Sequence, residues 1–93
     1  MNRVVINNNT FKTVLQELLK RKNETFVIKH KSGALRFAMT PLIIRCDSKS
    51  DFDVIYARSK LEKLMHIFSF VESQLVTIEF YDDGVIGIKE VLV

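Results

Sequence analysis

The side chains best suited to chemistry by type and spacing are two adjacent aspartates. Asp82 and Asp83 precede Gly84 in the otherwise apolar stretch FYDDGVIGI. A carboxylate pair of this kind can bind a metal ion or handle a proton. The same residues are also common at the polar tip of a β-hairpin, where aspartate and glycine tolerate the bend. Residue type leaves both interpretations open, so the elements that place this pair must decide between them.

The other reactive side chains stand far apart in the sequence. Cys46 is the only cysteine, which excludes an internal disulfide, and it reads as a small hydrophobic residue of a strand. A catalytic thiol would need a histidine close in space, and the sequence does not place one there. His30 and His66 have no carboxylate at ligand spacing, and we expect both at the surface. Asp51 and Asp53 should point outward at the start of a strand.

No motif for phosphate binding, zinc binding or nucleophilic catalysis occurs in the chain. We therefore expect no enzymatic activity, no catalytic residue, no metal site and no cofactor. The length of 93 residues suits one domain with a modest core. No apolar run approaches the ~18 residues that a membrane span needs, and the first apolar segment is too short for a secretory signal. These features predict a cytoplasmic protein without a membrane partner.

Apolar periodicity predicts two helices among short strands. One helical stripe runs through 11–22, with an asparagine or threonine available as its N-cap. A second runs through 59–71, where Ser59 and Glu62 have the spacing of a capping box. Alternating or β-branched stretches predict strands over 2–7, 24–30, 34–40, 41–47, 51–57, 74–81 and 85–93.

The first half of the chain falls on the second when it is shifted by fifty positions. Strand, cap, helical stripe, strand, turn glycine and strand recur in order, with one inserted residue before the last strand. Two unrelated units of this type would look similar at this level, but the constant offset favours a repeat. We therefore expect a single α+β domain, residues 1–93, with internal repeats over about 2–47 and 51–93.

The repeat also bears on the aspartate pair. Asp82 and Asp83 match Lys31 and Ser32 at the tip of the first hairpin. Lysine and serine are poor counterparts of a metal-binding carboxylate pair. We therefore interpret the two aspartates as turn residues that precede Gly84.

These patterns resemble one domain of the DNA sliding clamps, the polymerase processivity factors that include the bacterial β clamp and proliferating cell nuclear antigen. The F-x-x-V-L-x-x-L pattern over 11–18 is similar to the first clamp helix, and SKLEKLM after the strand DFDVIY is similar to the second. LVTIEFYDDGVIGI is similar to the hairpin that follows. The resemblance covers nearly the whole chain. It implies two β-α-β-β(-β) units that form an antiparallel sheet with two adjacent helices on one face.

The resemblance further implies that the helices face DNA. Basic residues outnumber acidic ones around both helices, whereas the rest of the chain is net acidic. Such residues can neutralise phosphates without reading the base sequence, as a sliding contact requires. A solvated helix face without a ligand is the alternative. The candidate DNA-binding residues are Lys12, Lys20, Arg21, Lys22, Arg58, Lys60 and Lys63.

Ile67 and Phe70 flank the apolar stripe of the second helix, where they either widen the core or lie exposed. If exposed, they favour self-association or a partner protein. The leading hypothesis is a non-catalytic, clamp-like homo-oligomer that encircles or contacts double-stranded DNA in replication or repair. One alternative is an interaction module, an adaptor or inhibitor, that binds a replication protein without contacting DNA. An unrelated two-repeat α+β domain is the third.

Overall fold

The computed structural model describes residues 2–81 and 86–90, except for the side chains of Ile86 and Glu90. The α+β class expected from the sequence is confirmed. Neither helix in these residues is long and apolar enough to cross a membrane. The elements in chain order are β1 (Asn2–Asn7), α1 (Asn8–Leu19), β2 (Thr25–Lys31), β3 (Ala34–Phe37), β4 (Ile43–Arg45), β5 (Phe52–Ala57), α2 (Arg58–Phe68), β6 (Leu75–Phe80) and β7 (Ile86–Glu90).

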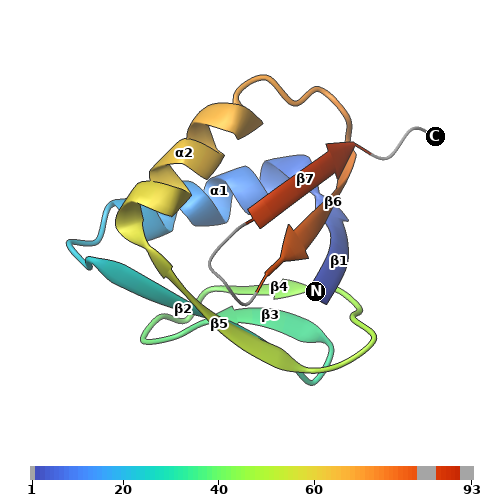
Figure 1. The fold of residues 1–93 in the computed structure, drawn as a ribbon, viewed down its shortest axis with the longest axis horizontal. Helices are drawn as coiled ribbons and strands as arrows, with labels where there is room; N and C mark the ends of the chain where they lie inside the picture. The colour runs from blue at the N-terminus through green and yellow to red at the C-terminus, as the bar shows by residue number, and fades with distance from the viewer. Residues whose placement is uncertain (1, 82–85, 91–93) are drawn as a thin grey trace.

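The strands divide into two antiparallel sheets, where a single sheet was expected. One sheet has the order β1-β6-β7 and the other has the order β4-β3-β2-β5. Each sheet therefore contains strands from both halves of the chain. The two helices pack against each other in the angle between the sheets (Figure 1). This arrangement gives both sheets and both helices a common core.

The strand pairing follows the fifty-residue offset of the sequence. Val4 of β1 faces Ile78 of β6, and Val54 of β5 faces Ile28 of β2. Shifting each member of the first pair by fifty positions, one forward and one back, produces the second pair. The two ladders that join the halves of the chain thus have equivalent registers.

The two hairpins repeat the same geometry with one difference in length. Ile28 faces Phe37 across β2 and β3, whereas Ile78 faces Ile88 across β6 and β7. The offset therefore grows by one residue between the strands of the hairpins, as the sequence predicted. In the first hairpin Ser32 and Gly33 both have positive φ, 54° and 74°, as a type I′ turn requires.

The second hairpin tip, with Asp82 and Asp83, lies outside the described residues. The predicted turn role of this pair therefore stays a prediction.

The core contains the apolar stripes predicted from the sequence. Phe11 of α1 and Phe68 of α2 are fully buried, and their ring centroids lie 5.1 Å apart. Inward-facing residues of the strands, such as Tyr56 and Phe80, complete the core from the two sheets. The contact between the helices is thus built around two aromatic rings from different halves of the chain.

The helix starts differ from each other. In α1 the side chain of Asn7 accepts a hydrogen bond from the Thr10 N–H at 3.0 Å, so the predicted asparagine N-cap is confirmed. In α2 the N-cap position is Ala57, which offers no side-chain hydrogen bond. The predicted capping box of Ser59 and Glu62 is therefore wrong.

A contact between the two units replaces the local cap of α2. The Arg58 N–H donates to the Glu24 carbonyl at 2.8 Å, and the Asn8 N–H donates to the Gln74 carbonyl at the same distance. These bonds continue the inter-unit ladders into the first residue of each helix. The start of each helix is thereby positioned by the opposite half of the chain.

Replacement of Phe68 by alanine should lower the free energy of unfolding by about 3 to 5 kcal/mol, because it leaves a cavity between the helices. Phe70, only two residues later, is 73% exposed. Phe70→Ala should change stability by less than about 0.5 kcal/mol. Urea unfolding followed by circular dichroism measures both. Equal losses for the two variants would contradict this packing.

Candidate functional site

The basic charge expected on the helices lies mostly at one end of the helix pair. Lys20, Arg21 and Lys22 follow the last residue of α1. Within α1 the charge of Lys12 is balanced by that of Glu17, so this helix carries no net charge. The structure therefore moves most of the predicted basic surface of α1 to the segment after it.

The start of α2 meets this segment. The Arg58 guanidinium donates to the carbonyl oxygens of Leu19, Arg21 and Asn23. The first turn of α2 therefore lies beside the basic end of α1. We call the residues that this contact brings together the junction cluster: Lys20, Arg21, Lys22, Arg58 and Lys60.

The members of the junction cluster differ in how free their charges are. Lys20 pairs with Glu17 at 3.0 Å on the exposed surface, and Arg58 lies 3.6 Å from Glu62. The three remaining members are exposed and form no ion pair with another described residue. These free cations, Arg21, Lys22 and Lys60, are the ones best able to reach an anionic ligand.

Two predicted DNA-binding residues lie outside the junction cluster. Lys63 is exposed on α2, one turn beyond the first turn of that helix. Lys12 is half-buried on α1. The seven predicted residues therefore do not form one continuous row, and the structure brings together five of them.

Arg58 has a structural role that sequence reasoning missed. Its counterpart Asn8 donates from Nδ2 to the Val71 carbonyl at 3.0 Å, which corresponds by the fifty-residue offset to the bond from Arg58 to Arg21. Each of these side chains thus ties the start of its helix to the segment after the other helix. A cation is well suited to this place because helix carbonyls at a C-terminus are left without partners.

The apolar residues predicted as an interface are exposed. Ile67 is 51% and Phe70 is 73% exposed, so they do not widen the core. His66 is exposed, as expected, and its ring meets that of Phe70 edge-on with centroids 5.3 Å apart. His66 and Ile67 lie in the last turn of α2 and Phe70 lies two residues beyond it, away from the junction cluster at the N-terminal end of this helix.

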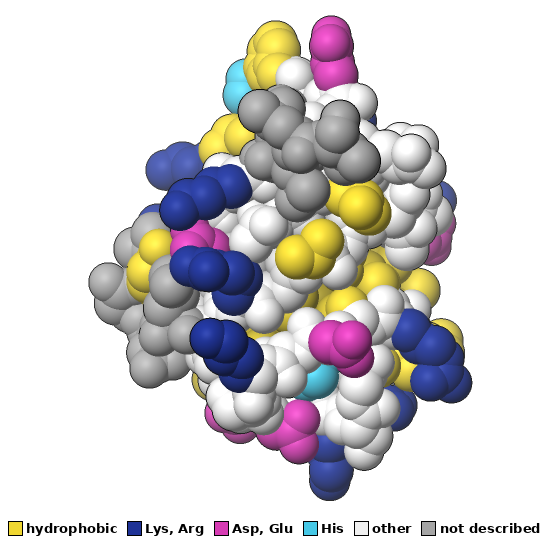
Figure 2. Space-filling model, turned by 90° about the vertical axis from the view of Figure 1, so that its right-hand side faces the viewer, with side chains coloured by type: hydrophobic (Ala, Val, Ile, Leu, Met, Phe, Trp, Pro, Cys, Tyr) yellow, Lys and Arg dark blue, Asp and Glu magenta, His cyan; other side chains and the backbone are white. Residues whose placement is uncertain are grey.

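Figure 2 shows the side of the molecule on which β1 and β6 lie in Figure 1, with a row of Lys and Arg side chains beside hydrophobic ones. Glu79 of β6 is only 4% exposed. Arg3 binds its carboxylate at 3.0 Å, Lys89 lies at 3.8 Å and the Tyr81 hydroxyl lies at 3.5 Å. Part of the basic charge on this face is therefore already neutralised.

Glycine in β7 makes room for this carboxylate. A Cβ at Gly87, which faces Glu79 across the ladder, would come within 3.2 Å of Glu79 Oε1. The small residue therefore lets the carboxylate lie flat under Arg3 and Lys89.

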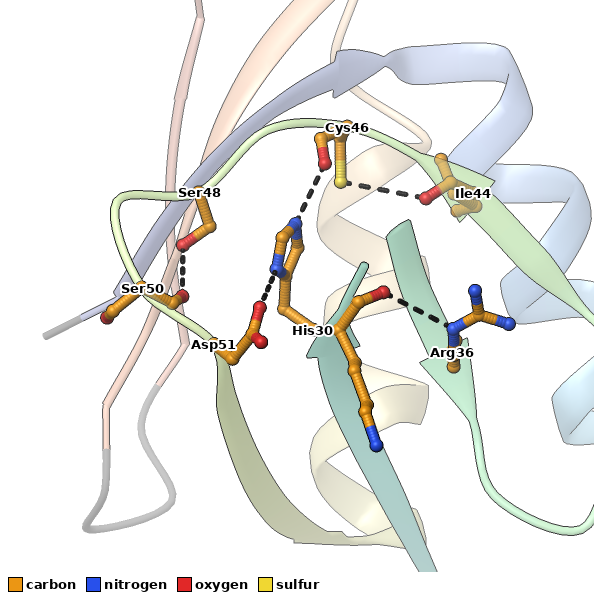
Figure 3. A network of polar contacts seen from close by, with 8 residues as sticks. His30, Arg36, Ile44, Cys46, Ser48, Ser50 and Asp51 are labelled. Carbon is orange, nitrogen blue, oxygen red and sulfur yellow. Dashed lines mark hydrogen bonds and ion pairs between the residues drawn. The ribbon is translucent and has the colours of Figure 1, made fainter. Parts of the chain in front are cut away.

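His30 was expected at the surface, but it is 4% exposed, and that prediction is wrong. It occupies the position that corresponds to the buried Phe80 in the second half. Its Nε2 lies 2.8 Å from the Cys46 carbonyl, and its Nδ1 lies 3.3 Å from the Asp51 carboxylate (Figure 3). The ring also stacks on Phe52. His30 thus holds both ends of the connection between the two halves of the chain.

The thiol and the imidazole do not form a nucleophilic pair. The Cys46 sulfhydryl donates to the Ile44 carbonyl at 3.6 Å, while His30 bonds to the backbone of Cys46 (Figure 3). Burial raises the pKa of the Cys46 thiol, and the negative charge of Asp47 raises it further. An activated cysteine needs the opposite shift. Among the described residues, no group of three or more His, Cys, Asp or Glu side chains could hold a metal ion.

Arg58→Ala should destabilise the fold by about 1 to 3 kcal/mol, because it removes the hydrogen bonds to the carbonyls after α1. Lys60→Ala removes the same charge two residues away without such contacts, and should cost less than about 0.5 kcal/mol. Chemical denaturation of both variants measures the difference. Equal stabilities would show that the Arg58 contacts contribute nothing.

Cys46 should react with iodoacetamide more slowly than free cysteine at neutral pH, because its raised pKa keeps the thiol protonated. Asp47→Asn should speed the reaction at a fixed pH, since it removes a charge that raises this pKa. Asp53→Asn, at an exposed carboxylate that does not contribute to this shift, is the control. The folded state holds the thiol proton more tightly than the unfolded chain does, which adds to the free energy of unfolding. This contribution is complete below the ordinary pKa of 9.0 and is lost as the pH rises through the folded-state pKa.

No protein-family model matches the chain, and no curated protein matches it in sequence. The resemblance to the sliding clamps therefore stays a prediction, and the function must be inferred from the residues of this chain.

Proposed function

We propose that the chain is a clamp-like, non-catalytic factor that contacts DNA phosphates through its junction cluster. It acts in the cytoplasm, in DNA replication or repair, as an assembly of several copies. The observation that carries this proposal is the equivalent register of the two inter-unit ladders, which packs both helices together and brings basic residues of both halves to one end.

The chemistry of the junction cluster suits phosphate binding without base reading. Arg21, Lys22 and Lys60 have flexible side chains, are exposed and are free of ion pairs with other described residues. Their binding to phosphates would release counterions, which makes such contacts strongly salt-dependent and independent of base sequence. Lys63, exposed on α2 outside the junction cluster, is a further candidate for phosphate contact.

The size of the chain supports the proposal of self-association. The described chain measures 36 × 28 × 25 Å, so one copy can line only one side of a duplex. To surround DNA it needs further copies. The exposed Ile67 and Phe70 offer apolar surface for contacts between copies.

A second candidate function rests on these same two residues. A partner protein could bind Ile67 and Phe70 at the C-terminal end of α2 without any contact to DNA. The chain would then be an adaptor or inhibitor of a replication protein. This candidate predicts binding that is insensitive to the junction cluster and sensitive to Ile67→Ser and Phe70→Ser.

The triple variant Lys20→Ala, Arg21→Ala, Lys22→Ala should bind a random-sequence duplex more weakly than the unchanged chain. The logarithm of its affinity should also depend less steeply on the logarithm of salt concentration, by about 0.9 for each phosphate that the variant no longer neutralises. Fluorescence anisotropy of a labelled duplex over a series of salt concentrations measures both effects.

A charge-matched control comes from the four-stranded sheet. Lys29→Ala, Lys31→Ala, Arg36→Ala removes three exposed cations from β2 and β3, and it should retain the original affinity and salt dependence. Equal losses in the two triple variants would mean that general positive charge, and not the junction cluster, binds DNA. No duplex binding at low salt would contradict the DNA proposal and favour the interaction module. Sedimentation with and without duplex tests self-association in the same samples.

A further inference from the structure

The hydrogen-bonding pattern of β1 leaves one of its edges open. The Asn8 N–H donates to the Gln74 carbonyl, which extends the β1·β6 register by one pair. In an antiparallel ladder only alternate residues bond to the partner strand, and the residues between them point their N–H and C=O groups the other way. The backbone groups of Arg3 and Val5 therefore point away from β6.

These outward groups form no backbone hydrogen bond with another described residue. The same reasoning applies to β5, because the Arg58 N–H donates to the Glu24 carbonyl. There the outward backbone groups belong to Asp53 and Ile55. Among the described residues, the edges of β1 and β5 are thus open at equivalent positions of the two halves.

The β1 edge borders a large hollow. Its volume is about 690 Å³, against about 360 Å³ for the hollow beside the start of β5. One wall is the first part of β1, and the other is the connection between the halves of the chain. The lining residues are Asn2, Arg3, Val5, Asp47, Ser48, Lys49 and Ser50.

The second wall is held in place by side chains that sequence reasoning missed. His30 contacts the Cys46 carbonyl and the Asp51 carboxylate, which bracket residues 47–50 on both sides. Ser48 also donates to the Ser50 carbonyl at 2.9 Å within the connection. The hollow therefore has two walls of defined position.

We infer that this hollow binds an extended segment of a partner protein, which adds to β1 as a further strand. Its backbone hydrogen-bonds to the outward N–H and C=O groups of Arg3 and Val5. This mode of recognition takes its affinity from the main chain and its specificity from alternate side chains.

The lining indicates which side chains the segment carries. Val5 is 49% exposed, so an apolar residue of the segment can pack against it. Arg3 and Lys49 outnumber Asp47, and Lys49 forms no ion pair with another described residue. Arg3 is 55% exposed, although it also binds Glu79. The hollow therefore fits a segment in which apolar and acidic residues alternate.

Charge disfavours β1 of a second copy as the occupant. Antiparallel pairing of two β1 edges would bring the net positive linings of two hollows together, and like charges across strands are destabilising. β5 of a second copy carries the acidic Asp53 and is therefore another possible occupant. The test below distinguishes it from a segment of a different protein. This inference does not depend on DNA binding, because the start of β1 lies across the molecule from the end of α1 (Figure 1).

The test uses a blocked heptapeptide of alternating valine and glutamate, added to the ¹⁵N-labelled full chain and followed by amide NMR. Its matched control is the same peptide with N-methyl groups on alternate residues, which cannot donate the ladder hydrogen bonds. We expect shifts at Arg3, Val5 and residues 47–50, and binding at least about tenfold weaker for the methylated peptide.

Two proline variants exploit the internal symmetry. Val5→Pro removes an N–H that β6 does not use, and proline is tolerated where a strand N–H faces outward. Ile55→Pro makes the same change at the equivalent position of β5. Peptide binding should be lost in the first variant and kept in the second, and Lys49→Glu should weaken it. If Val5→Pro does not fold, the comparison of the unmethylated and methylated peptides on the unchanged chain still tests the proposal.

Three results would overturn the inference. The first is equal binding of the methylated and unmethylated peptides, or no shifts up to about 1 mM peptide. The second is a set of shifts confined to another edge, such as that of β5. The third is a dimer in sedimentation without peptide that Val5→Pro abolishes, since the occupant of the edge would then be a second copy.

Discussion

The fold depends on the exchange of first strands between its two halves. β1 pairs with β6 and β5 pairs with β2, in equivalent registers. Neither half can complete its sheet alone, so the apolar faces of both sheets become available to one core only when the halves combine. The first N–H of each helix continues these ladders, through Asn8 and Arg58. The exchange therefore fixes the helix starts as well as the sheets.

The same constraint decides the electrostatics of the helix pair. Each helix starts beside the end of the other, so a side chain at the start can reach the carbonyls that the other helix leaves free. In one half this side chain is the neutral Asn8, and in the other it is Arg58. The cations that follow α1 thus lie beside a further cation, Arg58. Repulsion among them is offset in part by Glu17 and Glu62.

Local patterns in the sequence predicted the features that are determined by residues close together in the chain. The helical stripes around Phe11 and Phe68 and the inserted residue of the second hairpin are read from periodicity and offset. The sequence could not predict contacts that need distant partners. His30 is buried because Cys46 and Asp51 satisfy its ring nitrogens, and Glu79 is buried because Arg3 and Lys89 cover it. The capping box failed for the same reason, since a backbone contact from Glu24 replaced it.

The symmetry between the halves is broken where the chain crosses from one to the other. The connection through residues 46–51 has no counterpart within the described residues, because a chain of two units needs only one such link. It lies beside the start of β1, and His30 fastens it in a place that Phe80 fills in the other half. A polar group buried in a core costs free energy unless it is hydrogen-bonded. The hydrogen bonds that offset this cost for His30 are the ones that hold the connection in place. The open edge of β1 thereby acquires a second wall, for which the described residues show no equivalent at the edge of β5, and two edges with the same backbone pattern differ in what they can bind.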